Sequence, residues 1–212
     1  MTVNNKNLNL IEQDLKNYNA RLLIVSKNQN QQDIKLLHNM GYRYFAENRV
    51  QEAKVKYPPM NLQDLNLSLI GPLQTNKVSD ALKIFDVIQS LDREKIVQEI
   101  IKQKSKLLIT KTKSFFIQIN IGEEEQKSGI SIKYAKDFYH YCLSQNFNIV
   151  GLMCIPPNDL NPDFYFKKMV ALKSDIQSKL LLSMGMSGDY KIALKNNSDI
   201  IRIGSMIFNN EV

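Results

Sequence analysis

The sequence has no tryptophan, only two cysteines among its 212 residues and no long apolar run. A helix that crosses a membrane needs about 20 consecutive apolar residues, and no stretch of this chain approaches that length. Residues 1–7 contain no apolar core of the kind found in secretory signal peptides. Cys142 and Cys154 lack the spacing of metal ligands, so we expect buried thiols in a reducing compartment. These absences predict a cytoplasmic protein with no metal site and no membrane partner.

An excess of acidic residues is also lacking, because 28 lysines and arginines outnumber 21 aspartates and glutamates and give a formal net charge of +7. A basic chain is one mark of nucleic-acid binding. Here, however, the basic residues are dispersed and fall on expected solvent-facing helix surfaces, as Lys102, Lys104 and Lys106 do. Nucleic acid would require a clustered basic face, so we expect no nucleic-acid partner. The positive charge still favours anionic ligands such as phosphate esters.

Apolar strand-like segments alternate with helix-like segments along the whole chain. Strands are expected at 21–26, 42–46, 67–70, 85–90, 115–121, 149–155, 180–184 and 199–203. Helices are expected at 8–18, 31–40, 49–56, 76–84, 93–104, 132–144, 162–179 and 188–196. Short strands that are apolar throughout are typical of parallel sheets, and eight right-handed strand–helix units close a barrel. The pattern predicts one α/β domain over 1–212, a (β/α)8 TIM barrel with an extra N-terminal helix, or else an open doubly wound sheet.

Lys27 follows the first expected strand, the apolar segment 21–26. The carboxyl ends of barrel strands form the face on which TIM-barrel enzymes build their sites. We expect the side chain to be partly buried in the barrel mouth, which lowers the pKa of an amine and makes it nucleophilic. Such an amine forms a Schiff base with an aldehyde. A lysine chosen at random is more often a solvated surface residue, so this position alone is a weak signal.

Ser187 lies in the segment Gly185–Gly188, between the seventh expected strand and a helix. Free backbone N–H groups and a hydroxyl at the start of a helix bind phosphate. TIM barrels often bind phosphate after strands seven and eight. An ordinary turn in which Ser187 caps the helix explains the same residues equally well, so both interpretations stay open.

Arg202 lies within the eighth expected strand and is followed by Gly204 and Ser205. Burying an unpaired guanidinium is costly, so Arg202 should contact either a ligand or a carboxylate such as Asp189 or Glu47. Gly204 and Ser205 can offer backbone N–H groups to a phosphate. An amine, an anion cradle and an arginine at the ends of barrel strands together suggest one ligand, pyridoxal 5′-phosphate (PLP).

Eight segments of the chain match one known family in order and spacing. They are Val25–Lys27, Phe45–Glu52, Ile70–Lys77, Gln118–Ile121, Lys127–Gly129, Gly151–Met153, Leu182–Ser187 and Ile201–Phe208. On these segments the chain resembles the pyridoxal phosphate homeostasis protein family over nearly its whole length. One such segment would be weak evidence, but their shared order and spacing make the match strong.

The resemblance implies a fold-type III PLP-binding barrel like the N-terminal domain of alanine racemase. It implies that PLP is carried as a Schiff base on Lys27. It also implies that Ser187, together with backbone N–H groups around Gly204 and Ser205, holds the phosphate. The segments 71–74 and 127–129 are expected to be turns on the same rim of the barrel.

The resemblance further implies that Arg202 faces the pyridine nitrogen and that Asn48 and Met184 line the ring site. A permanently charged guanidinium disfavours protonation of that nitrogen, and an unprotonated ring is a weaker electron sink. A racemase of this fold also uses a second domain, which supplies a catalytic tyrosine opposite the lysine. We expect no such domain here, and no motif supports Tyr165 or Tyr190 as a substitute. No catalytic residue is therefore predicted.

The expected function is binding of PLP for vitamin B6 homeostasis, without turnover. Such a monomeric protein would store the cofactor or hand it over to apo PLP-dependent enzymes. The alternative is a small PLP-dependent amino-acid racemase or lyase on the same barrel. A second proton-transfer group opposite the lysine would distinguish the two.

Three positions depart from the family pattern. Ala46 stands where the family has glycine, Ser68 replaces a histidine and Leu69 replaces an aromatic residue. If the position of Ala46 requires a positive φ, alanine costs about 1 kcal/mol or more. The other two changes are expected to reshape the mouth of the barrel at the third strand.

Overall fold

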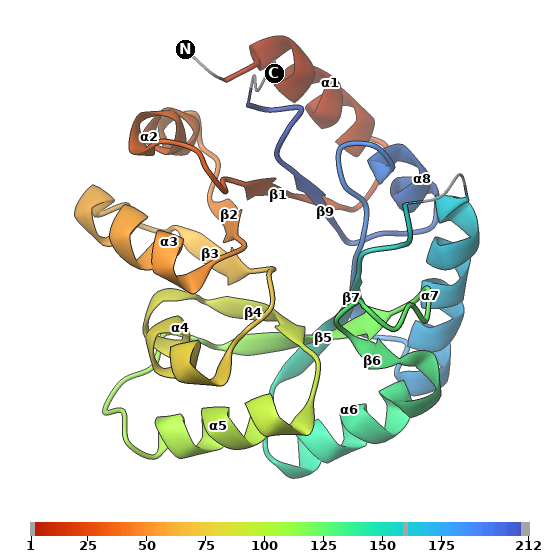
Figure 1. The fold of residues 1–212 in the computed structure, drawn as a ribbon. Coiled ribbons are helices and arrows are strands. Elements are labelled where there is room, and N and C mark those ends of the chain that lie inside the picture. Colours follow the sequence, from red (N-terminus) through yellow and green to blue (C-terminus); the bar gives the residue numbers. More distant parts are fainter. Residues whose placement is uncertain (1–2, 159–160, 209–212) are drawn as a thin grey trace.

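The structure is a computed structural model that describes residues 3–158 and 161–208, and within these ranges eight parallel strands form a closed barrel (Figure 1). Their order around the ring is β4 (Val87–Leu91), β3 (Asn66–Leu69), β2 (Tyr44–Glu47), β1 (Arg21–Val25), β9 (Ile200–Ile203), β8 (Leu181–Ser183), β7 (Ile149–Cys154) and β5 (Ser114–Asn120). β4 pairs with β5 in parallel and closes the ring. The predicted TIM barrel is confirmed, and the open doubly wound sheet is excluded.

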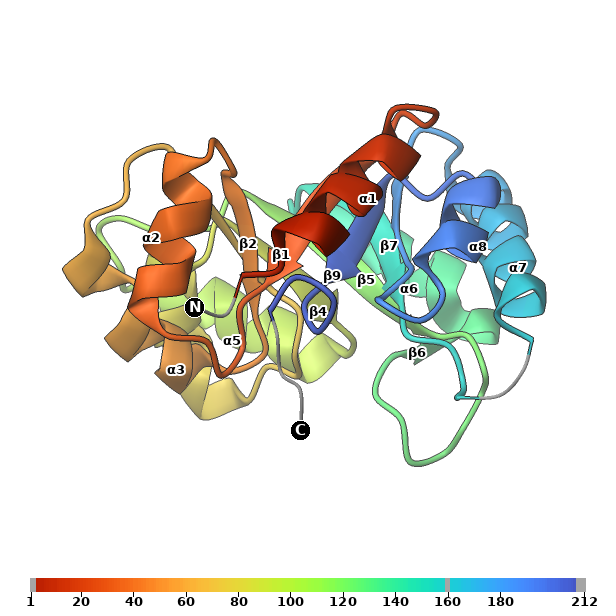
Figure 2. The ribbon, with the colours of Figure 1, turned by 90° about the horizontal axis from the view of Figure 1, so that it is seen from above.

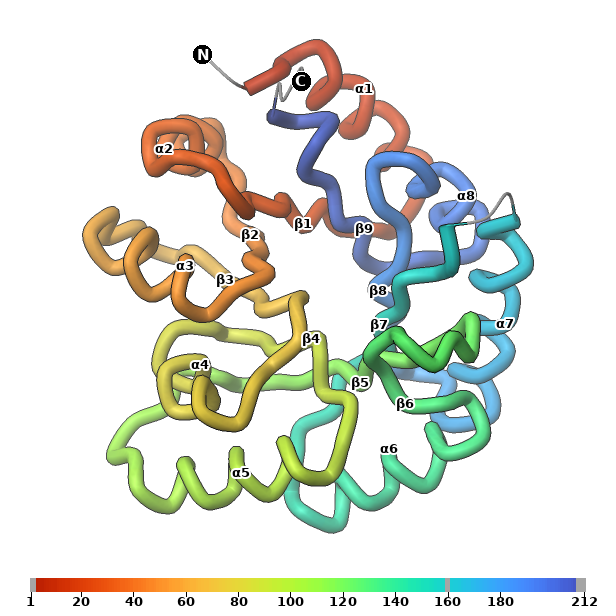
Figure 3. The backbone as a smooth tube through the Cα atoms, viewed as in Figure 1, coloured from red at the N-terminus to blue at the C-terminus, as the bar shows by residue number. Residues whose placement is uncertain are grey.

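Helices surround the barrel on its outer side, as the tube in Figure 3 shows. They are α1 (Asn5–Leu15), α2 (Gln31–Asn39), α3 (Val50–Lys56), α4 (Val78–Ile84), α5 (Glu94–Lys104), α6 (Ala135–Ser144), α7 (Pro162–Ile176) and α8 (Tyr190–Lys195). Short 3-10 turns lie at η1 (Pro58–Met60), η2 (Thr75–Lys77) and η3 (Ile132–Tyr134). Apart from α1, each main helix follows a strand and covers part of the ring, as expected for strand–helix units.

The amino-terminal helix α1 lies across the outside of the barrel near β1 and β9, as Figure 2 shows, and its start contacts the segment that follows β9. Leu8 and Ile11 form the buried face of this helix. Asn4 caps the helix through its side chain, and its backbone N–H donates to the carbonyl O of Ile207 at 2.7 Å. Asn7 Nδ2 donates to the carbonyl O of Met206 at 2.9 Å. These contacts confirm the extra N-terminal helix and join the two ends of the described chain.

Side chains of each barrel strand alternate between two apolar layers, because successive residues of a strand point to opposite faces. In β1, Leu22 and Ile24 belong to the large core between barrel and helices, whereas Leu23 packs with Ala46 and Met153 inside the ring. The inner layer is small and is completed by buried polar residues. This alternation decides which residues can reach the mouth of the barrel.

Several boundaries differ from the sequence prediction. The fourth strand begins at Val87 rather than at residue 85, because Asp86 lies before the strand and accepts the backbone N–H of Leu67 at 2.9 Å. A two-residue strand, β6 (Ile130–Ser131), was not expected; it follows the predicted turn at 127–129 and pairs with β5. The two cysteines are buried and free, as predicted. No helix in the described part of the chain is long and apolar enough to span a membrane.

Candidate functional site

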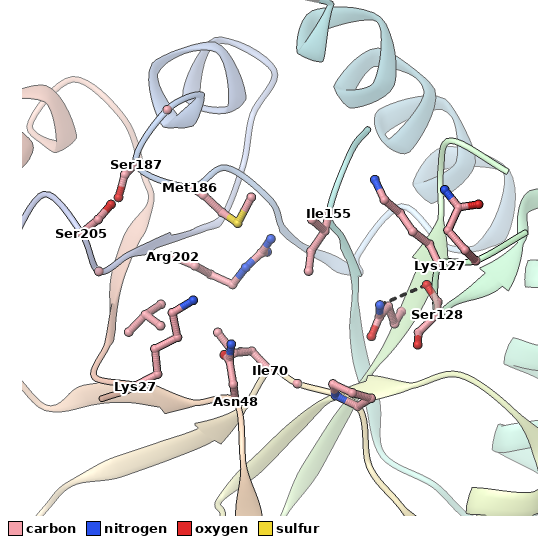
Figure 4. Close-up of a pocket in the computed structure, with 17 residues that line it drawn as sticks. Lys27, Asn48, Ile70, Lys127, Ser128, Ile155, Met186, Ser187, Arg202 and Ser205 are labelled. Atoms are coloured by element: carbon pink, nitrogen blue, oxygen red, sulfur yellow. Dashed lines mark hydrogen bonds between the residues drawn. The ribbon is translucent and has the colours of Figure 1, made fainter. Parts of the chain in front are cut away.

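A cavity of about 660 Å³ opens at the carboxyl ends of the barrel strands (Figure 4). Every segment that lines it lies at the end of a barrel strand or in the loop that follows one. The lining residues are Val25, Lys27, Asn48, Ile70, Gly71, Pro72, Gln118, Gln126, Lys127, Ser128, Ile155, Met186, Ser187, Gly188, Arg202, Gly204 and Ser205. Six of the seven residues predicted for the site therefore share one cavity.

Lys27 reaches the cavity because it continues the inner face of β1. Leu23 lies in the inner layer and Val25 packs against it, so two further residues along, Lys27 points the same way beyond the end of the strand. Figure 4 shows its amine directed toward the centre of the cavity. The expectation of partial burial is wrong, because Lys27 is exposed. The β1 strand ends at Val25, two residues earlier, and leaves the lysine on the open rim.

Arg202 is buried beneath the cavity floor, on the inner face of β9, and only 2% of it is exposed. Its guanidinium donates to the carbonyl O of Ser183 at 2.5 Å, to Ser183 Oγ at 3.0 Å and to the carbonyl O of Cys154 at 2.7 Å. No carboxylate in the described ranges forms an ion pair with it, and the proposed pairing with Asp189 or Glu47 is wrong. Burial lowers the pKa of the Arg202 guanidinium from its ordinary value.

A buried polar layer inside the ring supports this arginine. Ser183 Oγ donates to Gln89 Oε1 at 2.7 Å, and Gln89 Nε2 donates to Ser68 Oγ at 3.4 Å. Each member of the layer lies on the inner face of its strand and is at least 98% buried. Buried polar groups need such partners, so the layer fixes the position of the guanidinium. Ser68, one of the departures from the family pattern, is part of this layer.

Ser187 and Ser205 form the two sides of a polar cradle at the rim. Figure 4 shows their hydroxyls pointing toward one another from the loops after β8 and β9. Across 3–158 and 161–208, no acceptor takes a hydrogen bond from the backbone N–H groups of Ser187, Gly188 or Ser205. Free N–H donors and hydroxyls that converge on one point form an anion-binding site. The cradle is therefore suited to a phosphate group.

Gly204 brings this cradle close to the lysine. A Cβ atom added there would lie 2.8 Å from the carbonyl O of Val25, which is closer than real Cβ atoms approach backbone. The β9 turn can thus pass directly over the end of β1 only because residue 204 has no side chain. The structure brings the cradle and Lys27 to the same wall of the cavity in this way.

Met184 does not line the cavity, although the sequence placed it there. It is fully buried in the core between barrel and helices, while Met186 lies at the cavity instead. The β8 strand ends at Ser183, and Gly185 turns the chain with a φ of +94°. A Cβ on Gly185 would meet the Cβ of Ala193 at 2.5 Å, so this turn also needs glycine. The turn places Met186, two residues further along, at the cavity in place of Met184.

Asn48 lies at the cavity as expected, one residue beyond the end of β2. Ala46, on the same face of β2, is fully buried and does not have a positive φ. The strain considered for alanine at this position is therefore absent, because an extended strand accepts any L-residue. Leu69 is fully buried in the outer core and does not line the cavity.

Residues near the end of β5 were missed as site residues. Lys127 lies on the wall opposite Lys27 (Figure 4), with its Nζ 2.5 Å from Glu124 Oε2 and 3.3 Å from the carbonyl O of Pro156. Gln118 Nε2 donates to the carbonyl O of Ser128 at 3.1 Å and holds this loop against the barrel. The signal was present, since the segment 127–129 follows a strand end. It predicted a turn on the rim but not the direction of the side chains.

The chemistry of the cavity wall is cationic and amide-rich. Within the described residues, its lining contains two lysines and an arginine but no carboxylate, imidazole, phenol or thiol. Tyr190 does not reach it, because its hydroxyl donates to Asp14 on α1 at 2.7 Å, and Tyr165 packs against the outer core. The wall can bind an anion and present an amine to an electrophile. The titratable side chains that it presents are the amines of Lys27 and Lys127, on opposite walls, and the guanidinium of Arg202.

Comparisons with known proteins agree with this geometry. The family model for the alanine racemase N-terminal domain matches residues 5–211. The pyridoxal phosphate homeostasis protein of Aquifex aeolicus is 37% identical over 198 residues, with 89% of this chain and 86% of that protein covered. That of Haemophilus influenzae is 36% identical, with 95% of this chain and 93% of that protein covered.

Solved structures give the same result. PipY of Synechococcus elongatus without PLP superposes with a TM-score of 0.87 at 29% identity, covering 96% of this chain and 99% of PipY. The structure of PipY with PLP bound gives 0.84 at 28% identity, with the same coverage. Alanine racemase from Acinetobacter baumannii, at 16% identity and a TM-score of 0.76, shares the fold over 59% of its own length. The chain belongs to the pyridoxal phosphate homeostasis protein family, within the wider family of the alanine racemase N-terminal domain.

Proposed function

We propose that this chain binds PLP in the cavity at the barrel mouth and takes part in intracellular vitamin B6 homeostasis, without turnover of its own. The observation that carries the proposal is the convergence of an exposed amine, a buried guanidinium and a serine cradle on one cavity (Figure 4). The binding of PLP by PipY, a structural relative, supports it.

Three groups of PLP, the aldehyde, the phosphate and the ring nitrogen, would have a matching group on the cavity wall. When bound, PLP supplies an electrophilic aldehyde and an electron-accepting ring. Lys27 Nζ is the amine that would add to the aldehyde carbon with loss of water, which leaves a covalent link. Ser187, Ser205 and the backbone N–H groups beside them would hold the phosphate. Because Gly204 has no Cβ, the turn that carries the cradle can lie next to this lysine.

Arg202 would face the ring nitrogen and keep it unprotonated. Three hydrogen bonds to Ser183 and Cys154 fix the guanidinium, so it cannot turn aside to release that nitrogen. A carboxylate partner, which would favour a protonated ring, is lacking among the described lining residues. The cavity therefore binds the cofactor while giving weak support to carbanion chemistry.

Release follows from the open position of the amine. Lys27 is exposed at the rim, so water and an accepting apo-enzyme can reach the covalent link. We infer a role as a single-domain, monomeric cytoplasmic carrier that stores PLP and hands it over to apo PLP-dependent enzymes.

An amino-acid racemase or lyase is the alternative function, and Lys127 is the feature that favours it. This second amine lies across the cavity from Lys27, where a second proton-transfer group would stand. Incubating the PLP-loaded protein with L-amino acids in deuterated water tests it. Exchange of the α-proton that is lost in Lys127→Ala supports the enzyme, and absence of exchange supports the carrier.

The main experiment is a visible absorption spectrum of the protein with added PLP, before and after borohydride reduction, followed by peptide mass mapping. Wild-type protein should gain a band that reduction converts into a stable adduct on Lys27. Lys27→Ala should give neither. Lys77→Ala, which changes a half-buried lysine on the same rim that does not line the cavity, should behave as wild type. An adduct spread over surface lysines would contradict the proposal.

A further inference from the structure

Glu47, Glu52 and Lys56 form a charged cluster on the outer side of the barrel, behind Lys27. Lys56 Nζ lies 2.9 Å from Glu47 Oε1 and 2.5 Å from Glu52 Oε1. Lys56 and Glu47 are buried, and Glu47 has no exposed surface at all. Burying such charges is costly and needs close partners. None of the three lines the cavity, so contact with a ligand does not explain them.

The residue before Lys27 is held by this cluster. Lys56 Nζ donates to the carbonyl O of Ser26 at 2.8 Å, and Ser26 Oγ donates to Glu47 Oε1 at 2.9 Å. Tyr57, at the end of the same helix, places its hydroxyl 2.6 Å from Ser26 Oγ. Both the backbone and the side chain of Ser26 are thus fixed from outside the ring.

The residue after Lys27 is held by the same cluster. Asn28 has a φ of 61°, in the left-handed region, which few non-glycine residues adopt and which asparagine tolerates best. Its backbone N–H donates to Glu52 Oε1 at 2.6 Å. Glu52 Oε1 is in turn the atom that accepts from Lys56. One carboxylate oxygen therefore links the turn after Lys27 to the buried ammonium.

We propose that Glu47, Glu52 and Lys56 are positioning residues that fix the backbone on both sides of Lys27 and so place its amine for reaction. This proposal rests on the proposed function. A lysine amine ends a flexible four-carbon stem, so only its backbone origin can be fixed before a ligand arrives. Fixing that origin raises the fraction of amine orientations that meet an aldehyde held by the cradle.

The test uses Glu52 because its side chain is 21% exposed, so its replacement disturbs the buried core less than replacement of Glu47. Glu52→Ala removes the acceptor for the Asn28 N–H, whereas Glu52→Gln keeps an Oε1 acceptor. Lys54→Ala is the matched control, because it removes a different ion pair of the same helix α3, the one between Lys54 and Asp80 on α4. Three quantities are measured: the rate of covalent attachment of PLP to Lys27, the dissociation constant of inorganic phosphate, and hydrogen exchange of the Asn28 amide.

Glu52→Ala should slow attachment about tenfold, since small misplacements of reacting groups cost this much or more. Phosphate binding should be unchanged, because the cradle lies in the loops after β8 and β9 and Glu52 lies on α3. Exchange at Asn28 should become faster. Glu52→Gln should restore most of the rate and the protection, and Lys54→Ala should match wild type throughout.

An attachment rate in Glu52→Ala equal to wild type would overturn the proposal. An equal loss of phosphate binding would also overturn it, because it would show a general loosening of the barrel mouth. If wild-type protein forms no adduct on Lys27, the proposed function itself fails. Exchange at the Asn28 amide then decides whether the cluster holds this turn, and equal exchange in all variants refutes it.

Discussion

Replacing Gly204 with alanine adds one methyl group where the turn after β9 passes over the end of β1. The new Cβ would lie 2.8 Å from the carbonyl O of Val25 and 3.2 Å from the Val25 Cβ. The closer atom is backbone and cannot rotate away, so either β1 or the turn must shift. Because Lys27 is two residues beyond Val25, the shift separates the lysine from the phosphate cradle.

We expect Gly204→Ala to lower the free energy of unfolding by about 1–3 kcal/mol, the usual cost of overpacking a well-filled site. PLP affinity should fall about tenfold, which corresponds to the loss of roughly one hydrogen bond to a charged group. Gly188→Ala is the matched control, because a Cβ there has no atom within 4 Å. Its unfolding free energy should stay within about 0.5 kcal/mol of wild type.

Equilibrium urea unfolding gives the stabilities, and titration of the visible PLP band gives the affinities. The reasoning fails if Gly204→Ala unfolds at the wild-type urea concentration and binds PLP as tightly. It also fails if Gly188→Ala lowers the free energy of unfolding more than Gly204→Ala does, since the steric contact at residue 204 would then not decide stability.

Three further outcomes are expected. Burial raises the pKa of Glu47 above 4.5, so its contribution to the free energy of unfolding should fall as pH rises from 4.5 toward that higher pKa. Denaturant melts of Glu47→Gln across this range should show a smaller change of unfolding free energy with pH than wild type, and an equal change contradicts the assignment. Ser183→Ala leaves Gln89 Oε1 without its donor at 2.7 Å and should cost about 1–3 kcal/mol in urea melts, whereas a neutral result would show that the inner polar layer is dispensable. Burial raises the pKa of Cys142 and Cys154 to about 12. A thiol reagent at about pH 8 should therefore label the two thiols only as fast as the protein unfolds, and faster labelling would contradict their burial.

The barrel could be predicted because each strand is a short apolar run and the helix-like segments alternate with these strands along the whole chain. The two faces of a strand could not be told apart in this way, since both are apolar in β1. Only the closed ring shows that Leu23 and Val25 face inward, and hence where Lys27 points. The exposure of Lys27 was missed because the pattern did not show that the strand stops two residues before it.

The sequence predicted the positions of the residues proposed to hold the phosphate more closely than those of the residues proposed to line the ring. The predicted cradle lies in loops that follow strand ends, at Ser187, Gly204 and Ser205. An error of one residue in the end of a strand leaves these residues in the same loops at the rim. Met184 was placed wrongly, because the positive φ of Gly185 turns the backbone. Met186 therefore lines the cavity, and Met184 does not. Such a turn depends on contacts with α8 that are distant from any local pattern.

The closing of the ring by β9 has a consequence for how the protein is made. Lys27 emerges from the ribosome with the first strand, whereas Arg202 and the serine cradle emerge with the last segments of the barrel. Until β9 inserts between β1 and β8, the lysine has no anion site to face. A ligand that requires both halves can be captured only by a chain whose synthesis has passed residue 205. Because such a ligand binds only the closed ring, it also stabilises the closed ring by mass action. Loading would therefore report that the last strand is in place.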